Sequence, residues 1–242
     1  MFDKPNRAWS TGLRTANPEL RSSNVNLEHE PGTRNLEPGT VPIMMRGLLI
    51  AFEGLDQSGK QTQAEHLRDR LVEAGRRVRL LSFPAYETPI GTEIRKALDG
   101  TRDWGADVMQ LLYIANRYEA RPMIERELER GTILVCDRYM ASSIAYGESQ
   151  GLDAVWLRDV QQHLPQPDLT VLLDIAPQVS AQRKATDRDK YERDLALLAR
   201  VRESYLRQAG ATGWVCLDAS RHRDDVAADV FEAVKRLLQS AV

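Results

Sequence analysis

From Gly47 to the end of the chain, short apolar runs alternate with stretches in which apolar residues recur at a helical period. Most of the short runs are continuous, which is typical of strands that are covered on both faces. They predict five strands, at Leu48–Phe52, Val78–Phe83, Thr132–Cys136, Leu169–Asp174 and Trp214–Leu217.

The longer stretches predict helices at Lys60–Ala74, Val108–Arg130, Asp194–Gln208 and Asp224–Leu238. The first ends before a glycine, which is a favourable helix stop, and we expect the second to be broken near Pro122. Alternating strands and helices indicate βαβ units with right-handed crossovers and a mainly parallel sheet. Residues 47–242 are therefore predicted to form one three-layer α/β/α domain.

Residues 1–46 differ from the rest of the chain. They are rich in Asn, Pro, Arg, Glu and Thr and show no apolar period. Such a segment buries too little apolar surface to offset its ordering entropy, so we expect a disordered N-terminal extension. An arginine-rich targeting peptide is the alternative, and the acidic residues of the segment weigh against it. Met44 or Met45 offers an alternative start.

Composition and charge narrow the range of possible partners and locations. A formal net charge of -2 gives no general attraction to nucleic acid or anionic lipid. No apolar run approaches the roughly 20 residues that cross a bilayer, and the N-terminus has no hydrophobic signal core. We expect a cytoplasmic protein that binds neither nucleic acid nor membrane. Cys136 and Cys216 lie in apolar runs and are predicted to be buried, reduced thiols in strands.

The segment between the first predicted strand and helix carries a phosphate-binding pattern. Gly54 is followed, after four residues, by Gly59 and Lys60. Such a loop wraps backbone N–H groups around phosphate oxygens, and Lys60 would reach the β- and γ-phosphates of a nucleotide. The Mg²⁺-binding hydroxyl expected next is replaced by Gln61, with Thr62 after it. The flanking strand and helix argue against a plain turn and indicate an α/β fold of the P-loop NTPase type.

Ligands of parallel sheets bind at the carboxyl ends of the strands, and a second polar group follows the third predicted strand there. Asp137 can hold Mg²⁺ or its water shell, and Arg138 can clamp a phosphate. The alternative is a surface salt bridge.

Together these motifs resemble the thymidylate kinase (dTMP kinase) family of P-loop nucleoside monophosphate kinases. The resemblance covers essentially residues 47–238. The matching segments, in order, are Phe52–Gln63, Phe83-Pro84, Thr88–Gly91, Leu111–Arg117, Asp137–Tyr146, Pro167–Thr170, Asp189–Glu192 and Val201–Tyr205.

The resemblance implies a role for each matching residue. ATP binding falls to Glu53, Gly54, Leu55, Asp56, Gln57, Ser58, Gly59, Lys60, Gln61, Thr62 and Arg183. The dTMP-binding set is Asp56, Phe83, Tyr113, Arg117, Arg138, Ser143, Tyr146 and Tyr191. The implied catalytic residues are Lys60, Asp56, Arg138 and Arg188, and the implied magnesium-binding residues are Asp56 and Asp137.

Within that set, Asp56 would meet the deoxyribose 3′-hydroxyl, Tyr146 would pack against the sugar C2′, and Arg138 would bind the dTMP phosphate. Ser143 would lie near the base, and Arg183 would cover the adenine of ATP.

Tyr113 would stack on thymine, and Arg117 would donate to its O4. Being four residues apart, they share one helix face. Arginine only donates, so it suits O4 and opposes the amino group of cytosine. From the residues alone, a core tyrosine and a solvated arginine remain the alternative.

The basic stretch 183–193 would form a lid over ATP that excludes water and brings cations to the phosphoryl group. Arg188 is the candidate cation for the transition state, and a solvated helix face is the alternative.

The chain departs from the family pattern at three places. Gln61 lacks the loop hydroxyl. Gln57 stands where one branch of the family carries arginine and another glycine. Ala85 and Tyr86 stand where a phosphate-binding arginine commonly follows Phe-Pro.

The resemblance implies ATP-dependent phosphorylation of dTMP with Mg²⁺, giving dTDP and ADP for dTTP biosynthesis, by a homodimer. A kinase for another deoxynucleotide or nucleoside is one alternative. A nucleotide-binding regulator with weak catalysis is the other, although the Asn-Lys-x-Asp guanine signature is absent from the sequence.

Overall fold

The structure is a computed structural model that describes residues 46–183 and 194–240. The chain divides into two units, Met1–Pro42 and Ile43–Val242. The first unit lies outside the described residues, and with it almost all of the expected N-terminal extension. Residues 184–193 also lie outside them, which includes Arg188, Tyr191 and all of the expected lid except Arg183.

A five-stranded sheet forms the centre of the domain, in the order β2-β3-β1-β4-β5. Every neighbouring pair is parallel, which confirms the predicted sheet. The strands are β1 (Leu49–Glu53), β2 (Val78–Ser82), β3 (Ile133–Asp137), β4 (Leu169–Asp174) and β5 (Val215–Asp218). All of β1 is buried, as expected for the continuous apolar strand in the middle of such a sheet.

Eight helices accompany the strands in the described part of the chain. They are α1 (Lys60–Glu73), α2 (Pro89–Leu98), α3 (Ala106–Glu129), α4 (Met140–Glu148), α5 (Ala154–Asp159), α6 (Pro177–Arg183), α7 (Leu195–Thr212) and α8 (Arg223–Ser240). The four long helices were predicted. The shorter α2, α4, α5 and α6, which have between 6 and 10 residues, were not predicted.

The break that was expected near Pro122, in the second predicted helix, is wrong. Helix α3 runs without interruption from Ala106 to Glu129 and contains the proline. A proline removes one backbone donor from a helix, but tertiary packing supplies most helix stability in a folded protein. Ile124 and Leu128, which follow the proline, are buried against the sheet core, and this packing holds the helix together.

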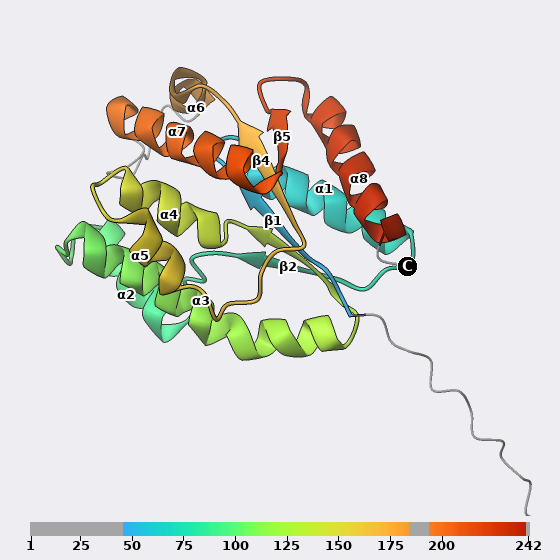
Figure 1. Cartoon of the computed structure of the whole chain (residues 1–242), viewed down its shortest axis with the longest axis horizontal. Coiled ribbons are helices and arrows are strands. Elements are labelled where there is room, and N and C mark those ends of the chain that lie inside the picture. Colours follow the sequence, from blue (N-terminus) through green and yellow to red (C-terminus); the bar gives the residue numbers. More distant parts are fainter. Residues whose placement is uncertain (1–45, 184–193, 241–242) are drawn as a thin grey trace, which may run out of the picture. The chain divides into compact units, whose positions relative to one another are not determined.

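Helices cover both faces of the sheet, which confirms the three-layer architecture (Figure 1). Leu49 and Ala51 of β1 share a buried cluster with α3, whereas Ile50 and Phe52 belong to the cluster that contains α1. Helices α1 and α8 contact each other on one side, and α4 contacts α3 and α7 on the other. Alternating side chains of a single strand thus anchor both helical layers.

One cysteine differs from expectation. Cys136 of β3 is buried as predicted, but Cys216 is exposed, so that part of the prediction is wrong. Strand β5 is an edge strand, and its residues alternate between partly buried and exposed. Within the described residues, no helix has both the length and the apolar character needed to cross a membrane.

Candidate active site

Two adjoining hollows lie at the carboxyl ends of β1, β2 and β3. The large hollow has a volume of about 940 Å³, and its lining includes Lys60, Asp137 and the first residues of α1. The small pocket, of about 100 Å³, is lined by Gln110, Tyr113, Arg117 and Ser143, among others. Five residues line both and form the passage between them: Asp56, Phe83, Pro84, Tyr86 and Arg138.

The loop after β1 has the backbone that its glycines predict. Gly54 has φ of 139°, and a Cβ at this position would collide with the carbonyl oxygen of Leu173. Gly59 has φ of 92° and precedes α1 without a side-chain cap, and the first turn of the helix holds no acidic residue. The first amides of α1 are therefore open to an anion, which the helix dipole favours at this end.

Lys60 is buried at the start of α1, and its Nζ donates to the carbonyl oxygen of Leu55 at 2.8 Å. Burial and the nearby Arg138 lower the pKa of Lys60 to about 8, against the opposing pull of Asp56 and Asp137. Phosphate oxygens bound beside Lys60 would stabilise its charged form, because they bring negative charge close to a buried ammonium group.

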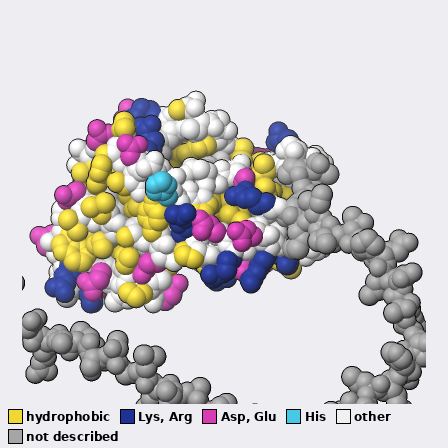
Figure 2. Space-filling model, turned by 60° about the horizontal axis from the view of Figure 1, so that its bottom comes forward, with side chains coloured by type: hydrophobic (Ala, Val, Ile, Leu, Met, Phe, Trp, Pro, Cys, Tyr) yellow, Lys and Arg dark blue, Asp and Glu magenta, His cyan; other side chains and the backbone are white. Residues whose placement is uncertain are grey.

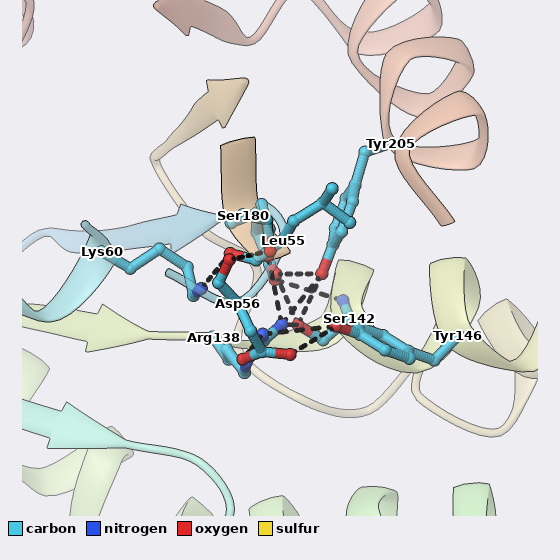
Figure 3. Close-up of polar contacts among 10 residues, drawn as sticks. Leu55, Asp56, Lys60, Arg138, Ser142, Tyr146, Ser180 and Tyr205 are labelled. Atoms are coloured by element: carbon cyan, nitrogen blue, oxygen red, sulfur yellow. Dashed lines mark hydrogen bonds and ion pairs between the residues drawn. The ribbon is translucent and has the colours of Figure 1, made fainter. Parts of the chain in front are cut away.

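Asp56 and Arg138 form the centre of the site (Figure 3). Arg138 Nη2 donates to Asp56 Oδ1 at 2.5 Å, and the Tyr146 hydroxyl donates to Asp56 Oδ2 at 2.9 Å. Burial alone would raise the pKa of Asp56, but Arg138 and Lys60 together hold it well below its usual range. Ser180 of α6 also donates to the Asp56 carbonyl oxygen at 2.7 Å, so the loop is fixed from two sides.

Arg138 adopts a left-handed backbone, with φ of 64°. Its N–H donates to the carbonyl oxygen of Phe52 at 2.9 Å, which ties this turn to β1. Non-glycine residues at positive φ often mark functional sites, because the surrounding structure must hold them there. The turn directs the guanidinium back toward the loop, where it reaches Asp56 and the Gly54 carbonyl oxygen.

Glu53 supports this arrangement from below. Its buried carboxylate accepts from the Tyr139 N–H at 2.9 Å, from Ser142 Oγ at 2.6 Å and from the Tyr205 hydroxyl at 3.2 Å. It thereby caps α4, whose own N-cap residue provides no side-chain bond. The Glu53 carboxylate faces the start of α4. It would therefore contribute to ATP binding only indirectly, by positioning Arg138 and the loop.

Sequence reasoning assigned no role to Ser142 or Tyr205. Both donate to Glu53 and also accept from Arg138 Nη1, at 3.1 and 3.3 Å. Both side chains are buried, and they hold the guanidinium and the carboxylate at fixed positions. Glu53 is separated from Ser142 by 89 positions and from Tyr205 by 152, so spacing along the chain does not indicate these contacts.

The small pocket contains the predicted base-binding residues. Arg117 is 2% exposed, and its Nη1 donates to Ser143 Oγ at 2.8 Å and to the Tyr113 carbonyl oxygen at 3.2 Å. The guanidinium lies over the Phe83 ring, 5.8 Å from its centre, and burial lowers the pKa of Arg117. The structure thus brings Tyr113, Arg117, Phe83 and Ser143 together.

Gln110 is a further residue of this pocket that the sequence reasoning missed. It is 1% exposed, and its Oε1 has no hydrogen-bond partner among the described residues. It precedes Tyr113 by three positions and Arg117 by seven, so all three share one face of α3. That helical spacing is the signal that could have identified it.

The acidic residues of the site suit a nucleotide-bound Mg²⁺ ion. Asp137 lines the large hollow, and its buried Oδ1 has no hydrogen-bond partner within residues 46–183 and 194–240. Both oxygens of Asp56 are engaged by Arg138 and Tyr146. In the described part of the chain, no cluster of three or more His, Cys, Asp or Glu side chains could cage a metal. One carboxylate with phosphate oxygens and water fits how Mg²⁺ is usually held.

The remaining loop residues are placed as follows. Gln61 Nε2 donates to Glu65 Oε1 at 3.0 Å on the exposed side of α1, and Thr62 lines the large hollow. Gln57 has φ of 61°, which explains why a glycine would suit this position. Arg183 donates to the carbonyl oxygens of Gln57 at 3.1 Å and Ala219 at 2.8 Å, which places it beside the loop.

Comparisons with known proteins agree with this geometry. A family model described as Thymidylate kinase matches residues 52–230. The chain belongs to the thymidylate kinase family. The thymidylate kinase of Schizosaccharomyces pombe is 32% identical over 197 residues, which cover 79% of this chain and 93% of that protein. The human thymidylate kinase is 34% identical over 188 residues, covering 76% of this chain and 88% of that protein.

The likeness to the thymidylate kinase family extends to three dimensions. The solved structure of the thymidylate kinase from Candida albicans matches with a TM-score of 0.70 at 30% identity. The match covers 79% of this chain and 92% of that chain. The segment that the thymidylate kinase model matches contains the loop and all the residues that line the two hollows.

Proposed function

We propose that this member of the thymidylate kinase family transfers the γ-phosphoryl group of ATP to dTMP, giving ADP and dTDP. The observation that carries the proposal is the continuity of the two hollows through Asp56 and Arg138. One hollow offers a phosphate-binding loop and the other a buried arginine beside an aromatic residue. A nucleoside monophosphate seated in the small pocket extends its phosphate toward the loop.

The donor end of the site is the loop with the start of α1. The open amides of α1 and the Lys60 ammonium bind the β- and γ-phosphates. Lys60 is held by its bond to the Leu55 carbonyl oxygen, and the loop is held by the bond from Ser180 to the Asp56 carbonyl oxygen. Arg183 lies on the outer side of the loop, a position that supports its role beside the adenine.

The acceptor end is the small pocket. Tyr113 stacks on the base, and Arg117 donates to O4 of thymine while Ser143 holds the guanidinium in place. The unpartnered Oε1 of Gln110 accepts from the N3–H of the base, which completes a donor and acceptor pair that cytosine cannot match. Asp56 and Tyr146 border the deoxyribose at the passage between the hollows.

The reaction needs no covalent enzyme intermediate. An oxygen of the dTMP phosphate attacks the γ-phosphorus of ATP while the bond to the β-phosphate oxygen of ADP breaks. Lys60 and the loop hold the donor, Arg138 neutralises charge where the phosphates meet, and positioning supplies much of the rate. A bound Mg²⁺ supplies further charge neutralisation, and Asp137 holds the ion or its water shell.

Arg188 and Tyr191 lie outside the described residues, so their place in the proposal rests on the sequence alone.

We also propose that the protein forms a homodimer. Val108 and Leu111 of α3 and Val155 of α5 are 39%, 43% and 57% exposed. Figure 2 shows apolar side chains gathered on part of one face of the molecule. A second copy that covered Val108, Leu111 and Val155 would bury exposed apolar surface. The free thiols support a cytoplasmic location.

A substrate panel tests the proposal. Purified protein with ATP and Mg²⁺ should release ADP fastest with dTMP, more slowly with dUMP, and least with dCMP or thymidine. Faster turnover of dCMP or thymidine would overturn the substrate assignment. Tight ATP binding with negligible turnover on every substrate would instead favour a nucleotide-binding regulator. The panel is informative because the structure of the Candida albicans relative is described as revealing the origin of broad substrate specificity.

A further inference from the structure

One arginine at the mouth of the site is used by none of the roles above. Arg95 of α2 lies with its guanidinium over the ring of Tyr86, 4.5 Å from the ring centre. Both residues line the large hollow that also contains Lys60 and Arg138. Tyr86 lines the small pocket as well, so the stacked pair lies where one hollow opens into the other.

Arg95 carries a charge that no carboxylate in the described part of the chain neutralises. The acidic neighbour on its own helix, Glu93, is paired with Lys96 at 2.6 Å and approaches Arg102 at 3.8 Å. The contact that orients Arg95 is the aromatic ring beneath it. Such stacking holds the planar guanidinium in place and leaves its N–H donors free at the edge.

The other cations of the passage are already engaged. Arg138 donates to Asp56, Tyr146, Ser142, Tyr205 and the Gly54 carbonyl oxygen. Lys60 donates to the loop, where the donor phosphates belong. A phosphate monoester carries about two negative charges near neutral pH, and the triphosphate beside it carries more. The acceptor phosphate therefore needs a cation that is not committed to the loop.

We propose that Arg95, held over Tyr86, binds the phosphate of the nucleoside monophosphate acceptor. The inference rests on the proposed function and adds a residue to it. Tyr86 is the second residue after the Phe83-Pro84 pair, in the segment where the family pattern commonly carries an arginine, and α2 places a guanidinium on top of it. The charge thus comes from α2 in this chain, and Tyr86 acts as a positioning residue for it.

Binding measurements separate this role from a structural one. The Arg95→Gln variant should bind dTMP about 10- to 100-fold more weakly by calorimetry, because it loses a charge-assisted, two-pronged contact. Its affinity for thymidine, which lacks the phosphate, should stay within about twofold of the parent. Arg95→Lys should recover only part of the loss, because an ammonium cannot form the fork or stack as well.

Two further variants serve as controls. Lys96→Gln removes the same charge one position along α2, on a side chain paired with Glu93, and should leave dTMP affinity within about twofold. Tyr86→Leu should weaken dTMP binding, and adding Arg95→Gln to it should cost less than in the parent, because the two act as one unit.

The outcomes are distinguishable. If the parent protein binds dTMP no better than thymidine, the proposed function fails together with this inference. If the parent prefers dTMP but Arg95→Gln weakens dTMP and thymidine equally, or weakens neither, then only the role of Arg95 is overturned.

Discussion

The carboxylate of Asp56 lies 2.5 Å from the guanidinium of Arg138, and these two residues belong to different strand ends of the sheet. Asp56 follows β1 within the phosphate loop, and Arg138 follows β3. The pair joins the wall of the large hollow to that of the small pocket. Movement of either side chain would therefore disturb donor and acceptor binding together.

Asp56→Asn tests this coupling. The change removes the charge that orients Arg138, so kcat/KM for dTMP should fall by about 100-fold or more, and ATP affinity should weaken with it. Steady-state kinetics with ATP binding by calorimetry would check this. Asp218→Asn is the matched control, because Asp218 lies at the carboxyl end of β5 and, among the described residues, its side chain is hydrogen-bonded only to Ser220. Equal losses in both variants would contradict the account.

The low pKa of Lys60 predicts a pH dependence. With a pKa of about 8 in the free protein, the ammonium loses its proton as the pH rises through that value. The kcat/KM for ATP should therefore decline above about pH 8. The kcat should persist to higher pH, because bound phosphates raise the pKa of Lys60.

Asp137→Asn should shift that decline in kcat/KM to lower pH, because the Asp137 carboxylate raises the pKa of Lys60. The position of the descending limb can be measured even if the maximal rate is reduced. A limb that stays in place, or that moves to higher pH, would show that another group controls it.

Glu53 is predicted to be a stability residue. Glu53→Ala leaves the Tyr139 N–H and the Ser142 and Tyr205 hydroxyls without their buried acceptor, and should lower the free energy of unfolding by about 3 kcal/mol. Urea denaturation measures this. Glu73→Ala, on the exposed end of α1, should change it by less than about 0.5 kcal/mol. A similar small change for Glu53→Ala would refute its role as the cap of α4.

Gln110 should contribute to base discrimination. Gln110→Leu removes the acceptor for the thymine N3–H, so kcat/KM for dTMP should fall about tenfold while that for dCMP changes less. Gln161→Leu is a matched control, because Gln161 is also buried with an unpartnered Oε1 but lies outside both hollows. Unchanged discrimination in Gln110→Leu would remove this residue from the recognition set.

The parts that sequence reasoning predicted are those encoded locally. The buried strand Leu49–Glu53 contains the continuous apolar run Leu49–Phe52, and Gly54, Gly59 and Lys60 lie within a few residues of one another, so both were identifiable. Tyr113 and Arg117 are likewise one helical turn apart.

The parts that were missed depend on contacts between distant segments. Glu53 reaches Tyr139 and Tyr205 across much of the chain, and nothing near Glu53 in the sequence indicates either partner. The stacking of Arg95 on Tyr86 depends on how α2, a helix of 10 residues that was not predicted, packs beside the segment that follows β2. Pro122 was read as a helix break because local propensity cannot include the burial of Ile124 beyond it.

The central claim is that one site joins an ATP-binding loop to a dTMP pocket, and dTMP-dependent transfer of a labelled γ-phosphate from ATP tests it most directly. The parent protein with Mg²⁺ should convert label from ATP into dTDP, with little ADP formed when dTMP is omitted. Lys60→Ala should form dTDP at least about 100-fold more slowly while keeping the same far-ultraviolet circular dichroism. Labelled dTDP formed equally by the parent and by Lys60→Ala, or no labelled dTDP from the parent, would contradict the account.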